Sequence, residues 1–496
     1  MPQAAFLAMT AAPATDMDNL KGRAVRGTAA VFVSQALHFG LNVAVAVILA
    51  RLLSPEDFGV FAIAFAVIGF LEFAKYGGMV VPVIQSQTLS REQLDTLFWF
   101  NTGVGVCVAL CACLIAPAVG YLYEDSRLLP LIMVLALTFI LGGLSTQHVA
   151  LLRRTMRFAR LAACEIAALA IGSAVGIFAA LHGEKYWSLV YMSVTREAVL
   201  LALAVIATRW IPAWPHRWAN IAPLIRFGGV MMAFDVMGFL TFKLDNLIVA
   251  WFLGATALGF YDKAYQFLLM PATQITLPLS NVVHATLSRL QTEPDRFRSY
   301  LRRALLLATS LGMPLTAFLY GNAATIIEQL LGARWLPSLP IFQALAPAAF
   351  VMTITACVGW ISFALGRARR QLTWTAAATA ATVCAFLVGV HWGAVGVAAA
   401  FSIARVGLLV PTLRYTCAGT SLKWSDLIAT AARPAFASIA ALIISALLTS
   451  AFPTSAWTLP RNALIFGALY SAFWVLLPGG RILMRENLQL AASLAR

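Results

Sequence analysis

The stretch ILARLLSPEDFGVFAIAF, residues 48–65, ends one apolar run, makes a turn and begins the next run. A second stretch, IVAWFLGATALGFYDKAY, residues 248–265, aligns with it without a gap at an offset of 200 residues. The residues identical at this offset are Arg26/Arg226, Phe39/Phe239, Ile48/Ile248, Ala50/Ala250, Leu53/Leu253, Gly59/Gly259 and Ala64/Ala264. The ungapped register and the shared helix–turn–helix pattern predict two copies of one structural unit.

The turn inside the first copy carries the signals of a helix start. Ser54 stands at the N-cap position, Pro55 at the first helical position, and Glu56 and Asp57 in the first turn. A serine side chain accepts hydrogen bonds from free N–H groups, proline needs no donor there, and acids favour the positive end of the helix dipole. These residues predict a helix that starts outside the membrane, and their role is structural rather than catalytic.

Apolar runs of membrane-spanning length recur on both sides of this stretch. Of the 496 residues, 61% are apolar and 11% charged, against about 45–50% and about 25% in an average soluble protein. A transmembrane helix needs about 20 apolar residues, and the strands of a β-barrel would alternate apolar and polar residues. The composition excludes a soluble enzyme, a disordered chain and a β-barrel, and predicts an all-α polytopic membrane protein. The fourteen predicted spans are 25–50, 58–83, 95–119, 128–151, 161–181, 187–208, 224–250, 262–288, 300–320, 337–365, 371–391, 394–414, 427–450 and 461–482.

Basic residues alternate between the loops in phase with these spans. The loops on the side of the N-terminus are basic, for example RRTMRFAR (153–160) and RFRSYLRR (296–303). The basic residues of the opposite loops are Arg51, Arg127, Lys185, Lys263, Arg334 and Arg461. By the positive-inside rule, both termini are expected in the cytoplasm. The net charge of +15 is then mainly an orientation signal, and no nucleic-acid partner is expected.

The repeat also predicts the domain organisation. An even number of spans separates the two copies, so they are parallel repeats related by an axis along the membrane normal. We expect a cytoplasmic tail at 1–20, a six-helix bundle at 21–215, a second at 216–420, and two additional helices with a cytoplasmic C-terminus at 421–496.

Charged residues at membrane depth are the candidates for function, because a charge at the bilayer centre costs about 2.5–3.5 kcal/mol and must face a cavity or a partner. They are Glu72, Lys75, Arg196, Glu197, Asp235, Lys243, Asp245 and Arg405. Glu72 and Lys75 are three residues apart and either pair on one helix face or line a cavity. Arg196 and Glu197 are adjacent, so each needs a partner on another helix. Asp245 lies near the outer end of its span, where solvation is the alternative.

The first span carries a polar stripe. Gln35, His38 and Asn42 are three and seven residues apart, which places them on one face of a helix. Such a stripe lines water or substrate, or bonds to a neighbouring helix. The seven cysteines form no two CxxC pairs, the histidines show no HExxH spacing, and no phosphate-binding loop is present. Neither a metal ion nor a cofactor is therefore expected.

Six stretches resemble the bacterial polysaccharide transporter family, whose superfamily also contains multidrug and toxin extruders and the lipid II flippase. They are ILARLLSPEDFGVFAIA (48–64), SREQLDTLFWFN (90–101), ALLRRTMRFARLAACEI (150–166), LDNLIVAWFLGATALGFYDKAYQFLLMP (244–271), LSRLQTEPDRFRSYLRRAL (287–305) and LLGARWLPSLPIFQALA (330–346). The resemblance covers residues 20 to about 420 and is strongest to exporters of the colanic-acid and xanthan type. One departure is the run Lys75-Tyr76-Gly77-Gly78, where such proteins often carry an acidic residue before the paired small residues.

The resemblance implies two six-helix bundles around a central cavity, with two extra helices. It implies a flippase rather than an enzyme, which turns an oligosaccharide repeat unit on undecaprenyl diphosphate from the inner to the outer leaflet of the bacterial inner membrane. The product would serve exopolysaccharide or lipopolysaccharide biosynthesis. The implied partners are this lipid-linked oligosaccharide, membrane lipid, and a polysaccharide polymerase with its export machinery.

The physical chemistry of this substrate assigns roles to the candidate residues. A diphosphate needs a hydrated, cationic path through hydrocarbon. We expect that path along Lys75, Arg196, Lys243 and Arg405, with Arg26 and Arg226 at its cytoplasmic mouth. Gln35, His38 and Asn42 are the candidates for sugar binding, and Glu72, Asp235 and Glu197 for coupling to protons or sodium. Rocking of the two halves would give alternating access.

Two other functions fit parts of the pattern. A cation-coupled drug or toxin extruder shares the superfamily fold, but the long basic loops favour the polysaccharide branch. A membrane polysaccharide polymerase or ligase would carry a large outer loop with a catalytic Arg or His, and every outer loop expected here is short.

Overall fold

The structure is a computed structural model. It describes the backbone of residues 35, 37–76, 83, 89–215, 221–449, 455 and 457–476. The side chains at 73–76, 223–224, 226–243, 272, 275, 278, 281, 285 and 368 are outside the description. Packing divides the chain into two compact units, Met1–Gly259 and Phe260–Arg496, which are described one at a time.

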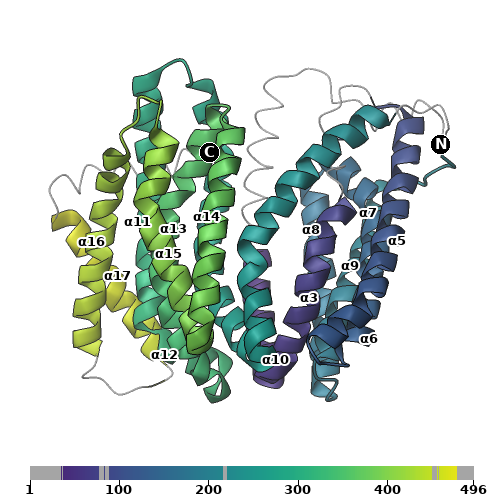
Figure 1. The fold of residues 1–496 in the computed structure, drawn as a ribbon, viewed down its shortest axis with the longest axis horizontal. Helices are drawn as coiled ribbons and strands as arrows, with labels where there is room; N and C mark the ends of the chain where they lie inside the picture. Colours follow the sequence, from purple (N-terminus) through teal and green to yellow (C-terminus); the bar gives the residue numbers. More distant parts are fainter. Residues whose placement is uncertain are drawn as a thin grey trace. The chain divides into compact units, whose positions relative to one another are not determined.

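The described residues form helices and connecting turns, with no strand among them (Figure 1). The first unit contains the helix Leu37–Leu52, α3 (Pro55–Tyr76), α5 (Arg91–Leu122), α6 (Leu128–Leu135), α7 (Leu137–Arg154), α8 (Phe158–Leu181), α9 (Trp187–Thr208) and the part of α10 (Ala222–Arg289) up to Gly259. The second unit contains the rest of α10, α11 (Pro294–Gly321), α12 (Ala323–Ile326), a π-helix (Ile327–Leu331), a 3-10 helix (Ala333–Ser338), α13 (Leu339–Ala364), α14 (Ala368–Gly389), a 3-10 turn (Val390–Trp392), α15 (Gly393–Cys417), α16 (Trp424–Thr449) and α17 (Thr458–Leu476).

Ten segments of the described chain are long and apolar enough to cross a membrane, and one of them, Arg369–Cys417, holds most of α14 and α15 in succession. The shorter apolar helix Leu37–Leu52 lies in the first predicted span. The prediction of an all-α polytopic membrane protein is confirmed. The predicted span 187–208 has the bounds of α9, because Arg209 takes a left-handed backbone conformation with φ 51° and ends the helix there.

Each unit is held together by neighbouring helices packed along their lengths. In the first unit α5 packs on α7, α7 on α9, and α8 on α9. A buried cluster there includes Leu94, Leu97, Phe98, Leu151 and Trp210. In the second unit α13 packs on α11 and α15, and α16 on α11 and α17. Its largest buried cluster joins the end of α10 to α11, α13, α15 and α16, through side chains such as Leu287, Leu301, Trp360, Leu413 and Leu427.

The connection between the predicted spans 224–250 and 262–288 differs from the expectation. The sequence predicts a loop between them, but the chain stays helical through this region except for a kink at Gly254, where φ is 80° and ψ 178°. A β-carbon at Gly254 would meet no neighbour within 4 Å, so the backbone angle and not the space requires glycine there. The predicted loop is absent because a single residue in a left-handed conformation redirects the helix.

The two repeat copies contact each other through matching residues. A β-carbon built on Gly59 of α3 would lie 1.7 Å from the carbonyl oxygen of Ala255, and one built on Gly259 would lie 1.9 Å from that of Pro55. Pro55 and Ala255 correspond at the repeat offset, as do Gly59 and Gly259. The contact is therefore reciprocal. It supports the interpretation of the two stretches as copies of one unit, and it depends on small residues one helical turn apart.

We predict that Gly259→Ala destabilises the protein, because the added methyl group overlaps a backbone carbonyl that no rotamer change can move. Overpacking of this kind costs about 1–3 kcal/mol. The thermal unfolding midpoint of the protein purified in detergent should fall. Gly103→Ala on α5 is the control, since its β-carbon meets nothing within 4 Å. Equal midpoints for Gly259→Ala and Gly103→Ala would show that the close contact is not needed for stability.

Candidate functional site

The polar stripe of the first span lies on the helix Leu37–Leu52 and on Gln35, two residues before it. Gln35 is exposed, and His38 and Asn42 are half-buried. Asn42 Nδ2 donates to the carbonyl oxygen of His38 at 2.8 Å and contacts Nδ1 of the same residue at 2.9 Å. Since an amide nitrogen is a donor, Nδ1 accepts and the neutral imidazole carries its proton on Nε2. The pair therefore presents a fixed N–H donor on the side of the ring away from Asn42.

The charges predicted on the sixth span lie on α9, next to α8. The side chain of Arg196 is exposed and that of Glu197 half-buried. A β-carbon on Gly172 of α8 would lie 2.9 Å from the β-carbon of Arg196, so the two helices touch at this level. The charge of Arg196 acts on His38 and on Glu165 of α8. Glu165 also lies 3.8 Å from Arg153. Three helices thus bring an arginine, a carboxylate and the His38–Asn42 pair into one electrostatic neighbourhood.

The structure describes the side chains of only some of the other predicted site residues. Glu72 is half-buried near the end of α3. Arg405 is half-buried on α15, with its guanidinium carbon 5.0 Å from the centre of the Phe401 ring, a cation–π distance. Arg26 lies outside the described residues, and so do the side chains of Lys75, Arg226, Asp235 and Lys243.

Two residues near the predicted turn of the second copy are buried instead of solvated. Asp245 is 3% exposed, and one of its carboxylate oxygens accepts from the backbone N–H of Asn246 at 2.8 Å. Lys263, expected at an outer loop, is 5% exposed inside α10 and donates to Gln266 at 2.9 Å. The expectation for Lys263 is wrong because the helix continues past Gly254 and carries this residue into a packed segment.

Sequence reasoning missed a buried polar cluster between α5, α7 and α9. His148 is 2% exposed, and its Nδ1 lies 2.8 Å from Oγ1 of Thr208, the last residue of α9. Because the Thr208 hydroxyl donates to the carbonyl of Ala204, the imidazole must donate in this bond. The rings of Phe98 and Trp210 flank His148. The run Thr146-Gln147-His148 inside an apolar span is the signal that indicates such a cluster.

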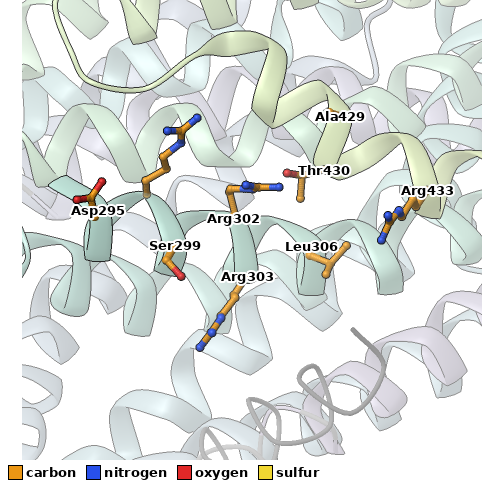
Figure 2. Close-up of a pocket in the computed structure, with 9 residues that line it drawn as sticks. Asp295, Ser299, Arg302, Arg303, Leu306, Ala429, Thr430 and Arg433 are labelled. Carbon is orange, nitrogen blue, oxygen red and sulfur yellow. The ribbon is translucent and has the colours of Figure 1, made fainter. Parts of the chain in front are cut away.

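A cationic cavity of about 650 Å³ lies between α11 and α16 in the second unit (Figure 2). Four arginines line it, namely Arg298, Arg302, Arg303 and Arg433. Three arginines of the basic run 296–303, which the sequence predicts to be an orientation signal, therefore line one wall of this cavity.

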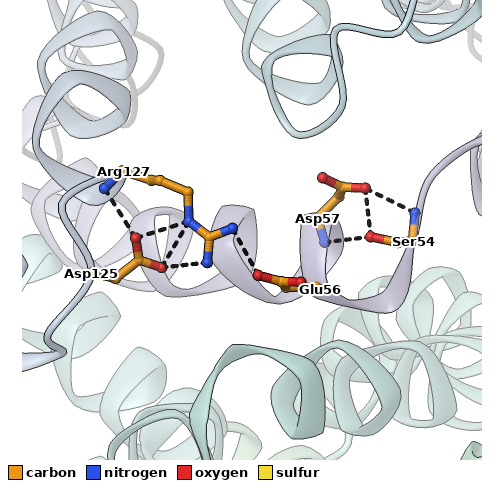
Figure 3. A network of polar contacts seen from close by, with 5 residues as sticks. All are labelled: Ser54, Glu56, Asp57, Asp125 and Arg127. Atoms are coloured by element: carbon orange, nitrogen blue, oxygen red, sulfur yellow. Dashed lines mark hydrogen bonds and ion pairs between the residues drawn. The ribbon is translucent and has the colours of Figure 1, made fainter.

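The start of α3 is tied to two other loops by Arg127 (Figure 3). Asp57 N–H donates to Ser54 Oγ at 3.2 Å, and the Ser54 hydroxyl donates to Asp57 at 2.6 Å, which confirms the predicted cap. Arg127 donates to Glu56 at 2.8 Å and holds Asp125 through Nε and Nη2 at 2.8–3.1 Å. It also lies 5.9 Å from the ring centre of Tyr186, the residue before α9. One guanidinium therefore connects α3, the α5–α6 turn and the start of α9.

The comparison with protein families decides the identity. A family described as polysaccharide biosynthesis proteins matches residues 48–340, more than half of the chain. The chain belongs to this family.

Named relatives agree with this membership. The lipopolysaccharide biosynthesis protein WzxC of Escherichia coli K12 is 22% identical over 395 residues, which cover 78% of this chain and 80% of WzxC. The succinoglycan biosynthesis transport protein ExoT of Rhizobium meliloti is 26% identical over 317 residues, 64% of each chain. The likeness to a family of polysaccharide transporters, expected from the sequence, is confirmed. ExoT is a transport protein, which agrees with the expectation that the chain is not an enzyme.

Solved structures show the same fold. The lipid II flippase MurJ in an inward closed conformation matches with a TM-score of 0.72 and 16% identity, covering 90% of this chain and 98% of MurJ. An inward-facing multidrug resistance transporter of the MATE family matches with a TM-score of 0.59 and 13% identity, covering 84% and 99%. At these identities the matches show the fold of this polysaccharide biosynthesis protein. They do not identify its substrate.

We predict that Arg127→Gln lowers the unfolding midpoint of this polysaccharide biosynthesis protein by an amount that depends on pH. Partial burial opposes ionisation of Asp125, but the hydrogen bonds and charge of Arg127 outweigh it and lower the pKa of this carboxyl. A lowered pKa stabilises the fold above the unfolded-state pKa of about 3.9, and the stabilisation is lost as the pH falls through the folded-state pKa. The loss in Arg127→Gln, on the order of 1 kcal/mol for a partly exposed pair, should therefore be largest near pH 6 and shrink below about pH 4.

Thermal unfolding of both proteins between pH 6 and pH 3 checks this. Arg160→Gln removes an exposed arginine near the start of α8 and should leave the midpoint near that of the wild type. A constant difference between wild type and Arg127→Gln across this pH range would contradict the role of Asp125.

Proposed function

We propose that this protein is a flippase that moves an undecaprenyl-diphosphate-linked oligosaccharide repeat unit across the bacterial inner membrane, for exopolysaccharide or lipopolysaccharide biosynthesis. The observation that carries the proposal is the neighbourhood of Arg196, His38 and Asn42 within an apolar helical unit. A cation near an oriented hydrogen-bond donor suits a ligand that carries both phosphate and sugar hydroxyl groups. Membership in a polysaccharide biosynthesis family supports the same substrate class.

In this mechanism the diphosphate follows arginine and lysine side chains across the membrane while the lipid tail stays in the bilayer. Arg196 provides charge in the first unit and Arg405 in the second. We propose Lys75 and Lys243 as further members of the path, with Arg26 and Arg226 at its cytoplasmic mouth. Arginine suits this task because its planar fork binds phosphate oxygens in pairs and stays charged at depth.

The remaining candidate residues have proposed roles in sugar binding and in coupling transport to an ion gradient. Gln35, His38 and Asn42 would bind sugar hydroxyl groups, and the Nε2–H of His38 is the donor that the Asn42 contact orients. Glu72, Asp235 and Glu197 would take up and release protons or sodium ions. Rocking of the bundles 21–215 and 216–420, with 421–496 as an addition, would expose the path to each side in turn.

The orientation of the chain belongs to the same proposal. We propose that both termini are cytoplasmic, because the basic loops would then lie on the cytoplasmic face. A polysaccharide polymerase and export machinery would receive the flipped unit on the other side.

We predict that Arg196→Gln lowers export of the repeat unit about 10- to 100-fold, since a lost charge-assisted hydrogen bond costs about 1.5–3 kcal/mol. Lys243→Gln should act in the same direction. Arg196→Lys keeps the charge and should recover part of the activity. Because the Arg196 side chain is exposed, both Arg196 variants should reach the membrane and unfold at the wild-type midpoint. The measurement is polymer export and lipid-linked intermediate in a deletion strain complemented with each variant. Wild-type export by both Arg196→Gln and Lys243→Gln would contradict the cationic path.

The same deletion strain separates this function from that of a drug extruder. A flippase strain accumulates the undecaprenyl-linked intermediate on the inner leaflet and loses polymer. A strain that lacks an extruder would keep its polymer and become sensitive to cationic drugs instead. Accumulation of no lipid-linked intermediate would remove the main support for the flippase.

A further inference from the structure

The cavity between α11 and α16 is lined by one face of each helix. Ser299, Arg302 and Arg303 continue from Arg298 at the spacings that place residues on one side of a helix, and Thr430 and Arg433 do the same on α16. Figure 2 shows the Arg302 side chain extending from α11 toward Thr430. The cavity is therefore formed by the packing of α16 on α11, and both helices belong to the second unit.

The charge of this cavity is only partly balanced. Arg298 forms an ion pair with Asp426 in the first turn of α16. Asp295 lines the cavity together with Arg302 and Arg433, so these three residues and the Arg298–Asp426 pair sum to a formal charge of +1. Like charges that line one cavity repel each other. An anion in the cavity would relieve that repulsion and strengthen the packing of α16 on α11.

The backbone favours the same kind of ligand. Both α11 and α16 begin beside the cavity, at Pro294 and Trp424, so the positive ends of both helix dipoles lie close to it. Arg433 lies nine residues into α16, about 14 Å along the helix axis. Its long side chain allows the guanidinium to reach from this position to a phosphate group at the level of the lipid headgroups.

The lining also has an apolar edge. Leu306 on α11 and Ala429 on α16 border the cavity. Beyond Arg433, α16 exposes Phe436, Ile439, Ile443 and Leu447, which lie three to four residues apart along one side of the helix. A free phosphate ion would leave this edge unused, whereas a lipid would place its phosphate on the arginines and an acyl chain along the exposed stripe.

We propose that this cavity binds the phosphate of an anionic phospholipid and that the bound lipid stabilises the packing of α16 on α11. Basic pockets between transmembrane helices at the cytoplasmic surface bind anionic headgroups in this way. The site is separate from the proposed substrate path, because no residue of that path lines it. Its ligand stays in place as a structural lipid and is not transported.

The test uses the full-length protein in detergent with added dioleoylphosphatidylglycerol, dioleoylphosphatidylcholine or inorganic phosphate. Phosphatidylglycerol should raise the unfolding midpoint of the wild type and appear as a bound lipid in native mass spectrometry. Phosphatidylcholine and inorganic phosphate at the same concentration should do neither. In Arg302→Gln the affinity for phosphatidylglycerol should fall about tenfold, and in Arg302→Gln/Arg433→Gln about a hundredfold.

Arg296→Gln is the matched control. Arg296 is in the first turn of α11 and pairs with Glu293 at 2.8 Å, but it does not line the cavity. This variant loses the same charge and should bind phosphatidylglycerol as the wild type does. Arg302→Lys keeps the charge at an exposed position and should retain most of the affinity for phosphatidylglycerol. This variant tests the role of the charge even if the double variant fails to fold.

Three outcomes would overturn the proposal. The first is an equal response to phosphatidylglycerol and phosphatidylcholine. The second is an equal loss of affinity in Arg296→Gln and Arg302→Gln. The third is a response to inorganic phosphate, or to added undecaprenyl phosphate, that exceeds the response to phosphatidylglycerol. None of these readouts uses export activity, so they are independent of the proposed function.

Discussion

The close contact between α3 and α10 is the constraint on which the first unit depends. Gly59 and Gly259 allow two backbones to approach so closely that neither position has room for a β-carbon. In a membrane, helices gain little from hiding apolar side chains from one another, so such backbone approach and interhelical hydrogen bonds supply much of the association. The kink at Gly254 lies just before this contact and sets the direction in which α10 leaves it. The cap at Ser54 and the bonds of Arg127 then hold the start of α3 in place.

Polar groups inside the apolar helices are satisfied mostly by local partners. Thr208, Thr309 and Thr316 donate to carbonyl groups four residues earlier in their own helices. Asn42 bonds to His38 one turn away. Hydrocarbon offers no partner to an exposed donor, so a short intrahelical bond is the least costly solution. Arg196 is different, because it brings a full charge to an exposed position beside the His38–Asn42 pair, and this difference makes it the stronger candidate for substrate contact.

The arginines of the chain serve more than one purpose. As loop residues they are expected from the sequence to orient the helices, by the positive-inside rule. In the structure, Arg127 connects three loops of the first unit, and the arginines of α11 and α16 surround a cavity. A charge that orients a helix during insertion remains available for binding afterwards, because orientation depends only on which side of the membrane it occupies.

The sequence by itself determined the all-α membrane fold, the positions of nearly all the helices and the cap at Ser54. Helix formation depends on residues within one or two turns, and apolar run length sets which helices span. The tertiary structure alone decided that Gly254 is a kink and not part of a loop, that Lys263 and Asp245 are buried, and that His148 meets Thr208. It also decided that arginines on α11 and α16 share one cavity. These features join residues far apart in the chain, and the spacing of residues along one helix carries no information about which other helix packs against it.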